Sequence, residues 1–121
     1  MAESIFKTKS YQFAILIVKL SQTLVSEKKE YVLSKQLLKS GTAVGALIRE
    51  AEFAQSKGDF SHKMSISLKE ANESVYWIDL LKDTNYINEG THTSLVSNCK
   101  ELVAMLVSSI KTTKSRIEYG K

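Results

Sequence analysis

The side chains that most often carry chemistry are few in this sequence and do not converge. His62 and His92 occur singly, no Cys/His cluster has zinc-binding spacing, and no glycine-rich phosphate loop follows a strand. Glu70 and Glu73 lie three residues apart on one face of a predicted helix, where paired carboxylates could hold a metal ion. Di-iron bundles also need Glu-x-x-His motifs, and the one such spacing, from Glu89 to His92, falls in a predicted loop. We therefore expect no catalytic residue, metal site or cofactor, and interpret the glutamate pair as part of a salt-bridged interface.

The single cysteine and the N-terminal segment bear on the compartment. Cys99 cannot form an internal disulfide, and its apolar helical register predicts a buried core residue in a reducing cytoplasm. Lys19 interrupts the apolar run 13–18, well short of the ~20 residues that a membrane span needs, and no signal peptide is recognisable. We expect a cytoplasmic protein without a membrane segment.

The remaining candidates for chemistry are cations. Lysine and arginine number 17 against 13 acidic residues, for a net charge of +4. Residues 59–90 are net acidic, whereas the segments 1–30, 31–58 and 91–121 are each net basic. This segregation favours either binding of a polyanion or contact between acidic and basic faces of two subunits.

The elements that position these side chains are predicted to be helices. The 121 residues contain no proline, five glycines and 43% hydrophobic residues, which permits long helices around the core of one domain, 1–121. We predict an all-α fold of four antiparallel helices without β-strands, at about 10–27, 31–57, 60–84 and 94–118. Gly58 is expected to end the second helix in a left-handed conformation and Asp59 to cap the third. Residues 83–93, with Gly90, are expected to form the last loop.

Two helices have an apolar stripe in addition to the one that faces the core. The first helix has Phe6, Phe13, Ile17, Leu20 and Leu24 on one face, and the third has Phe60, Met64, Leu68, Ala71, Val75 and Ile78. Trp77 belongs to the second stripe of the third helix and has an N–H group that needs a partner, as an interface anchor does. We predict that the second stripes form an oligomer interface through Tyr11, Ile15, Val18, Ile66, Glu70, Glu73, Trp77 and Leu80.

Gly41 and Gly45 lie four residues apart inside the second helix. Each destabilises a helix by ~1 kcal/mol relative to alanine. We expect a close approach of a neighbouring helix to offset this cost.

The candidate nucleic-acid contacts lie on outward faces. The second helix displays Lys35, Lys39 and Arg49, with Phe53 as a side chain that could stack on a base, and the fourth displays Lys100, Lys111 and Lys114. The alternative is a solvated basic face with Phe53 packed against a neighbouring helix.

Several motifs of the second and third helices occur together with a characteristic order and separation. They are Gln36 to Ser40, Val44 to Ala46, Ile48 to Ala51, Ser56, Asp59-Phe60, Lys63, Leu68 to Ala71, Glu73 and Tyr76-Trp77. With these motifs the chain resembles the bacterial 23S rRNA intervening sequence protein family, also called four-helix-bundle proteins.

The resemblance implies an up-down-up-down four-helix bundle that assembles into a homopentameric ring and has no catalytic residues. Genes of this family can lie in insertions of ribosomal RNA genes. A related branch comprises the accessory variability proteins of diversity-generating retroelements, basic pentamers that bind nucleic acid and a reverse transcriptase. The sequence departs from the family pattern at Ala43, where serine is common, and at Leu47, where asparagine is common.

Charge segregation and resemblance together suggest a non-enzymatic, cytoplasmic homo-oligomer that binds nucleic acid, either RNA or an RNA-containing complex. The alternative is a scaffold or adaptor for another protein, for example a reverse transcriptase, without direct contact to nucleic acid.

Overall fold

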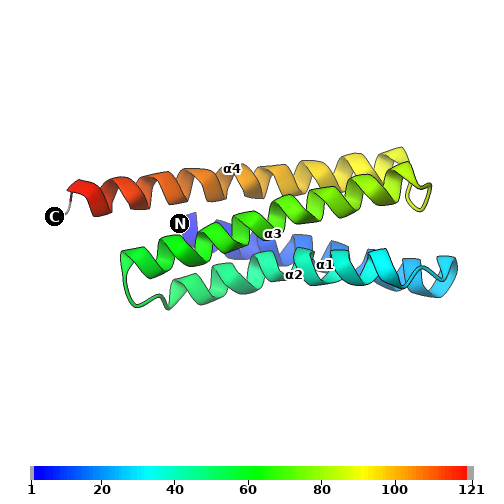
Figure 1. Ribbon diagram of the computed structural model, residues 1–121, viewed down its shortest axis with the longest axis horizontal. Helices are drawn as coiled ribbons and strands as arrows, with labels where there is room; N and C mark the ends of the chain where they lie inside the picture. Colours follow the sequence, from blue (N-terminus) through cyan, green and yellow to red (C-terminus); the bar gives the residue numbers. More distant parts are fainter. Residues whose placement is uncertain (1, 120–121) are drawn as a thin grey trace.

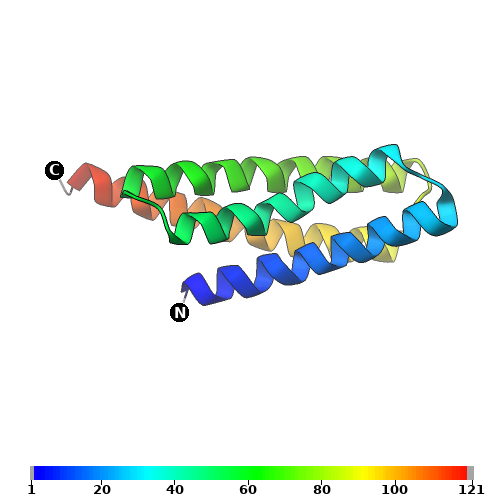
Figure 2. The same ribbon diagram turned by 90° about the horizontal axis from the view of Figure 1, so that it is seen from below.

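The computed structural model describes residues 2–119, which form four long α-helices and, within that range, no strand (Figure 1). The helices are α1 (Ala2–Lys28), α2 (Val32–Glu52), α3 (Lys57–Asp83) and α4 (Glu89–Tyr119). The chain reverses direction at each connection, so consecutive helices are antiparallel (Figures 1 and 2). The predicted all-α four-helix fold is confirmed.

Each helix packs against the next one along the chain, and α4 returns to contact α1. The α1–α4 pair is the least closely packed, while α1 and α3, like α2 and α4, are diagonal, with no Cα atoms within 8 Å of each other. The core contains residues of all four helices, among them Phe13, Ile17, Leu37, Ile78 and Leu106. The diagonal arrangement decides which surface residues can act together.

The two glycines of α2 lie against α1. A Cβ atom on Gly41 would lie 2.9 Å from two side-chain carbons of Ile17, and one on Gly45 would lie 3.3 Å from the Ser10 hydroxyl oxygen. Any side chain at Gly41 would therefore push the helices apart. The predicted close approach of a helix at these glycines is confirmed.

Serine and cysteine side chains join the other helices in the interior. The Ser67 hydroxyl donates to the Val44 carbonyl at 2.9 Å, and the Ser74 hydroxyl lies 3.0 Å from that of Ser40. The Cys99 thiol donates to the Ala71 carbonyl at 3.2 Å. Burial raises the pKa of Cys99 to about 12, so the thiol stays neutral, as expected for a core residue.

These serines correct the predicted inward face of the third helix. Phe60, Leu68 and Val75 are only partly buried, whereas Ser67 and Ser74 are fully buried. The buried face of α3 is therefore rotated relative to the predicted face. Small polar residues can lie at the closest contacts because hydrogen bonds to α2 satisfy the two hydroxyl groups.

The turn between α2 and α3 differs from the prediction. The second helix ends at Glu52, five residues earlier than expected, and α3 begins at Lys57. Ser56 is extended and its hydroxyl accepts a hydrogen bond from the Asp59 N–H at 3.0 Å, so Ser56 is the cap of α3. Gly58 lies inside the first turn and no described glycine has a positive φ, so the predicted left-handed Gly58 is wrong.

Asp59 also stabilises this turn, through contacts with residues before and after it. Its carboxylate accepts a hydrogen bond from the Gln55 N–H at 3.1 Å and pairs with Lys63 at 3.4 Å. The backbone hydrogen bond from Gln55, and then the charge of Lys63, hold the pKa of Asp59 below its usual value. The predicted role of Asp59 as the helix cap is therefore replaced by a bond to the preceding loop.

The last loop is also shorter than predicted. The Asn88 side-chain oxygen accepts from the Thr91 N–H at 2.8 Å, and α4 begins at Glu89 with Gly90 in its first turn. The left-handed residues are instead Lys29, with φ 54°, and Asn85, with φ 68°, which follow α1 and α3. Helix α1 likewise starts eight residues before the expected position.

Substitution by alanine should have opposite effects at Gly58, in the first turn of α3, and at Gly41, which lies against α1. Gly58→Ala places a methyl group 3.8 Å from the Ser56 hydroxyl oxygen, an ordinary van der Waals contact, and should raise the free energy of unfolding by up to ~1 kcal/mol through helix propensity. Gly41→Ala forces a shift of Ile17 and should lower it by about 1 kcal/mol or more. Urea unfolding followed by circular dichroism measures both variants. If Gly58→Ala destabilised the protein instead, the result would support the left-handed conformation of Gly58 that was predicted from the sequence.

Candidate nucleic-acid interface

The predicted cations all lie at the surface. We call Lys35, Lys39 and Arg49 the α2 cations and Lys100, Lys111 and Lys114 the α4 cations; all six are exposed. Among the side chains that the structure describes, those of residues 5–118, none of the six takes part in an ion pair. Their charges are therefore available to an external anion.

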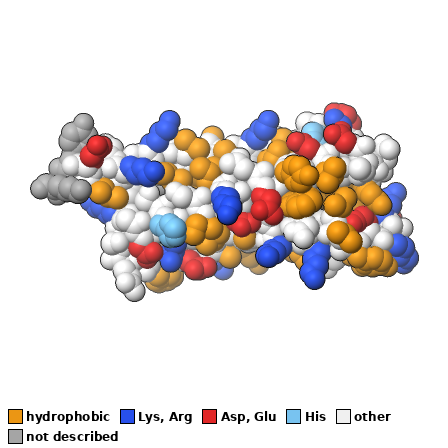
Figure 3. Space-filling view, in the orientation of Figure 1, with side chains coloured by type: hydrophobic (Ala, Val, Ile, Leu, Met, Phe, Trp, Pro, Cys, Tyr) orange, Lys and Arg blue, Asp and Glu red, His pale blue; other side chains and the backbone are white. Residues whose placement is uncertain are grey.

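The fold separates the two sets of cations. Helices α2 and α4 are diagonal, so their outward faces point away from each other. On the face of the molecule in Figure 3, cations are scattered and acidic side chains lie between them. The six residues therefore do not form one continuous patch.

Phe53 follows the last residue of α2 and is 82% exposed. Its ring does not pack against a neighbouring helix of the same chain, so the alternative in which Phe53 packs against such a helix is wrong within one chain. Its ring is free to stack on a base or on a protein partner.

Arg49 connects the α2 cations to the predicted oligomer interface. Its guanidinium lies 5.1 Å from the centre of the Tyr11 ring, in a cation–π contact between α2 and α1. A subunit that covered Tyr11 would also reach Arg49. Lys35 and Lys39 are therefore the α2 cations whose role is easiest to separate from assembly.

The predicted stripe on α1 is an apolar surface in the single chain. Tyr11 is 55% exposed, Ile15 39% and Val18 36%, and Leu16 and Val25 are exposed beside them. Because water contact with so many large apolar side chains on one helix is unfavourable, this face is suited to a partner.

The predicted stripe on α3 is more protected. Ile66, Glu70, Glu73, Trp77 and Leu80 are all partly buried. The Trp77 indole N–H donates to the Glu73 carboxylate at 3.1 Å, and the Tyr76 ring meets Trp77 edge-on with centroids 4.9 Å apart. The partner that the Trp77 N–H was expected to need is thus supplied within the same helix.

The Glu-x-x-His spacing lies in a helix and not in a loop as predicted. His92 Nε2 lies 2.7 Å from Asp79 Oδ1, and Glu89 pairs with Lys82 at 3.3 Å, so both side chains tie the start of α4 to α3. Among the described residues, no group of three His, Cys, Asp or Glu side chains could hold a metal ion. No helix in the same range has the length and apolar character of a membrane span.

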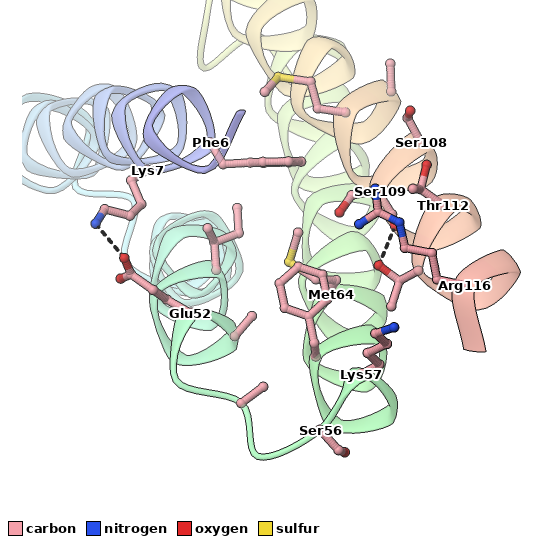
Figure 4. A pocket seen from close by; sticks show the side chains of 17 residues that line it. Phe6, Lys7, Glu52, Ser56, Lys57, Met64, Ser108, Ser109, Thr112 and Arg116 are labelled. Carbon is pink, nitrogen blue, oxygen red and sulfur yellow. Dashed lines mark hydrogen bonds and ion pairs between the residues drawn. The ribbon is translucent and has the colours of Figure 1, made fainter. Parts of the chain in front are cut away.

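A groove that the sequence did not predict lies at the end of the bundle where α1 and α3 begin and α2 and α4 end. Its volume is about 840 Å³. Figure 4 shows Phe6 and Met64 projecting into it, the Lys7–Glu52 pair on one side, and Lys57 and Arg116 on the other. The sequence offered one signal, a cationic last turn of the fourth helix, which the helix dipole alone explains.

Comparison with known proteins places this architecture in a family. The family model described as 23S rRNA-intervening sequence protein matches residues 2–108. The crystal structure of a protein of unknown function from the S23 ribosomal protein family, from Bacteroides thetaiotaomicron, superposes with a TM-score of 0.90 at 50% identity and covers 92% of this chain and 99% of that one. None of the curated proteins matches the chain. As the sequence motifs predicted, the chain belongs to the 23S rRNA-intervening sequence protein family.

Proposed function

We propose that this protein is a non-enzymatic homo-oligomer that binds nucleic acid, either RNA or an RNA-containing complex, through the α2 and α4 cations. The observation that carries this proposal is that all six side chains are exposed and free of ion pairs in the described part of the chain. The family description, which refers to 23S rRNA, supports RNA as the first ligand to test.

Two lysines of α1 behave differently. Lys7 pairs with Glu52 at 3.0 Å, and Lys9 pairs with Glu101. These lysines already have a nearby negative charge, so moving them onto a phosphate releases less net free energy. Nucleic acid should therefore contact the unpaired cations in preference to the paired ones.

Assembly is the second part of the proposal. The exposed stripe of α1 supplies an apolar surface of the kind that subunits bury, and its residues are large and contiguous. The homopentamer that family resemblance implies is the state we favour.

The alternative function is a scaffold for another protein, such as a reverse transcriptase. It draws support from exposed aromatic side chains, since Phe53 is 82% and Tyr76 59% exposed and aromatic residues often anchor protein interfaces. The dependence of nucleic-acid binding on salt separates the two functions.

The salt dependence of RNA binding tests the basic surfaces. For a single-stranded oligonucleotide, the variant Lys35→Gln/Lys39→Gln should reduce the magnitude of the slope of log K against log salt by roughly 1.4, because two phosphate contacts are lost. Fluorescence anisotropy titrations at several salt concentrations measure this slope. The control Lys7→Gln/Lys9→Gln removes the same formal charge from paired lysines and should change the slope less. No binding by the unaltered protein, or equal slopes for all three proteins, would favour the scaffold.

Light scattering tests assembly through α1. Ile15→Lys places a charge in the exposed apolar stripe and should lower the oligomer mass, because an unpaired charge in a buried interface is costly. Gln12→Lys adds the same charge at an exposed polar position of α1 and is the control. Ile15 is a cleaner probe than Trp77, which also packs against the core of its own chain. A monomeric unaltered protein at micromolar concentration would contradict the proposed assembly.

A further inference from the structure

The groove at the end of the bundle has a shape and a charge distribution typical of a small-molecule site. Its volume, about 840 Å³, lies within the roughly 300–1,000 Å³ that such sites occupy. It exists because α1 and α4 are the least closely packed neighbours, so their facing side chains do not close the seam. The α2 and α4 cations discussed above do not line it.

The inner part of the groove is apolar. Phe6, Ile48 and Met64 are almost completely buried, and Phe60 and Met105 are partly buried beside them. The two methionines are flexible and adapt to ligands of different shape. Burial of an alkyl chain against these side chains would release it from water.

The rim of the groove carries net positive charge. Lys57, in the first turn of α3, and Arg116, near the end of α4, both line it, and neither takes part in an ion pair among the described residues. The acidic residue that lines the groove, Glu52, and Asp59, two residues after Lys57, are already engaged. Glu52 is held by Lys7 at 3.0 Å, and Asp59 pairs with Lys63 and accepts from the Gln55 N–H.

Hydroxyl groups extend the polar side of the groove along α4. Ser108, Ser109, Thr112 and Thr113 line it, and the Thr113 hydroxyl donates to the Ser109 carbonyl at 2.9 Å. Hydroxyls can donate to a carboxylate that two cations hold. An apolar interior with a cationic, hydroxyl-bearing rim therefore complements one chemical class of ligand.

We propose that this groove binds an amphiphilic anion, a straight-chain carboxylate whose alkyl chain lies among Phe6, Met64 and Met105 and whose head group meets Lys57 and Arg116 (Figure 4). The charge complementarity of the rim selects this occupant over a neutral or cationic amphiphile. The inference goes beyond nucleic-acid binding and uses residues that the proposed nucleic-acid surfaces do not include.

Isothermal titration calorimetry with sodium decanoate on the full chain tests the proposal. Decanoate should bind saturably with one site per chain, and about tenfold more tightly than decylamine, because charge-assisted hydrogen bonds form only with the carboxylate. The variant Lys57→Gln/Arg116→Gln should weaken decanoate binding about tenfold, whereas the control Lys111→Gln/Lys114→Gln, on α4 but outside the groove, should change it less than about twofold.

A second variant separates loss of the site from loss of charge. Ala104 lines the groove and is exposed, so Ala104→Trp should obstruct the site without disturbing the core, and circular dichroism should show an unchanged helical spectrum. Abolished decanoate binding with unchanged RNA binding is the expected result. The absence of decanoate binding to the unaltered protein, equal binding of decanoate and decylamine, or equal effects of the two charge variants would overturn the proposal.

Discussion

The close approach of α1 and α2 at Gly41 and Gly45 sets the geometry on which the rest of the bundle depends. A Cβ atom at Gly41 would lie 2.9 Å from side-chain carbons of Ile17, so the absence of a side chain at Gly41 lets Ile17 of α1 pack directly on the backbone of α2. Small side chains continue this pattern, with Ser67 bonded to the Val44 carbonyl and Cys99 to that of Ala71. Three of the four neighbouring helix pairs are drawn together in this way. The fourth pair, α1–α4, lacks these contacts, and its looser packing leaves the groove open at one end of the bundle.

Several acidic side chains help to hold this framework together. The buried Glu30 carboxylate accepts hydrogen bonds from the N–H groups of Val32 and Leu33, at 2.9 and 2.6 Å, and so starts α2 without a side-chain cap from Tyr31. Asp59 performs a related task in the loop before α3. These carboxylates act at helix ends or in ion pairs with other lysines, and none of them pairs with the α2 or α4 cations in the described chain.

Much of the fold could be predicted from the sequence, and each error of the prediction has a physical reason. Hydrophobic periodicity located all four helices and most of the core, because a buried stripe must recur every three or four residues. Glycine was interpreted as a helix break at Gly58 and Gly90, yet both lie two residues after a real cap, Ser56 or Asn88, in a first turn that tolerates glycine. The buried Ser67 and Ser74 of α3 were missed because their partners are a carbonyl and a hydroxyl group of α2. The predicted cations were correctly placed at the surface, but local periodicity carries no information on the diagonal positions of α2 and α4 or on the groove between distant segments.

The diagonal placement of the two sets of cations limits how a nucleic acid can meet this protein. Neighbouring helix axes in bundles are about 8–10 Å apart, so diagonal helices are farther apart, and their outward side chains add further separation. The Debye length at physiological ionic strength is about 8 Å, so the α2 and α4 cations cannot reinforce each other's field across the bundle. A strand bound to one chain therefore engages one set, unless it passes from one subunit to the next. Since Arg49 borders the apolar stripe of α1 through Tyr11, a subunit that covers this stripe also narrows access to the α2 cations. Under the proposed function, the number of nucleic-acid strands bound per chain would depend on which of the two sets of cations the proposed assembly leaves exposed.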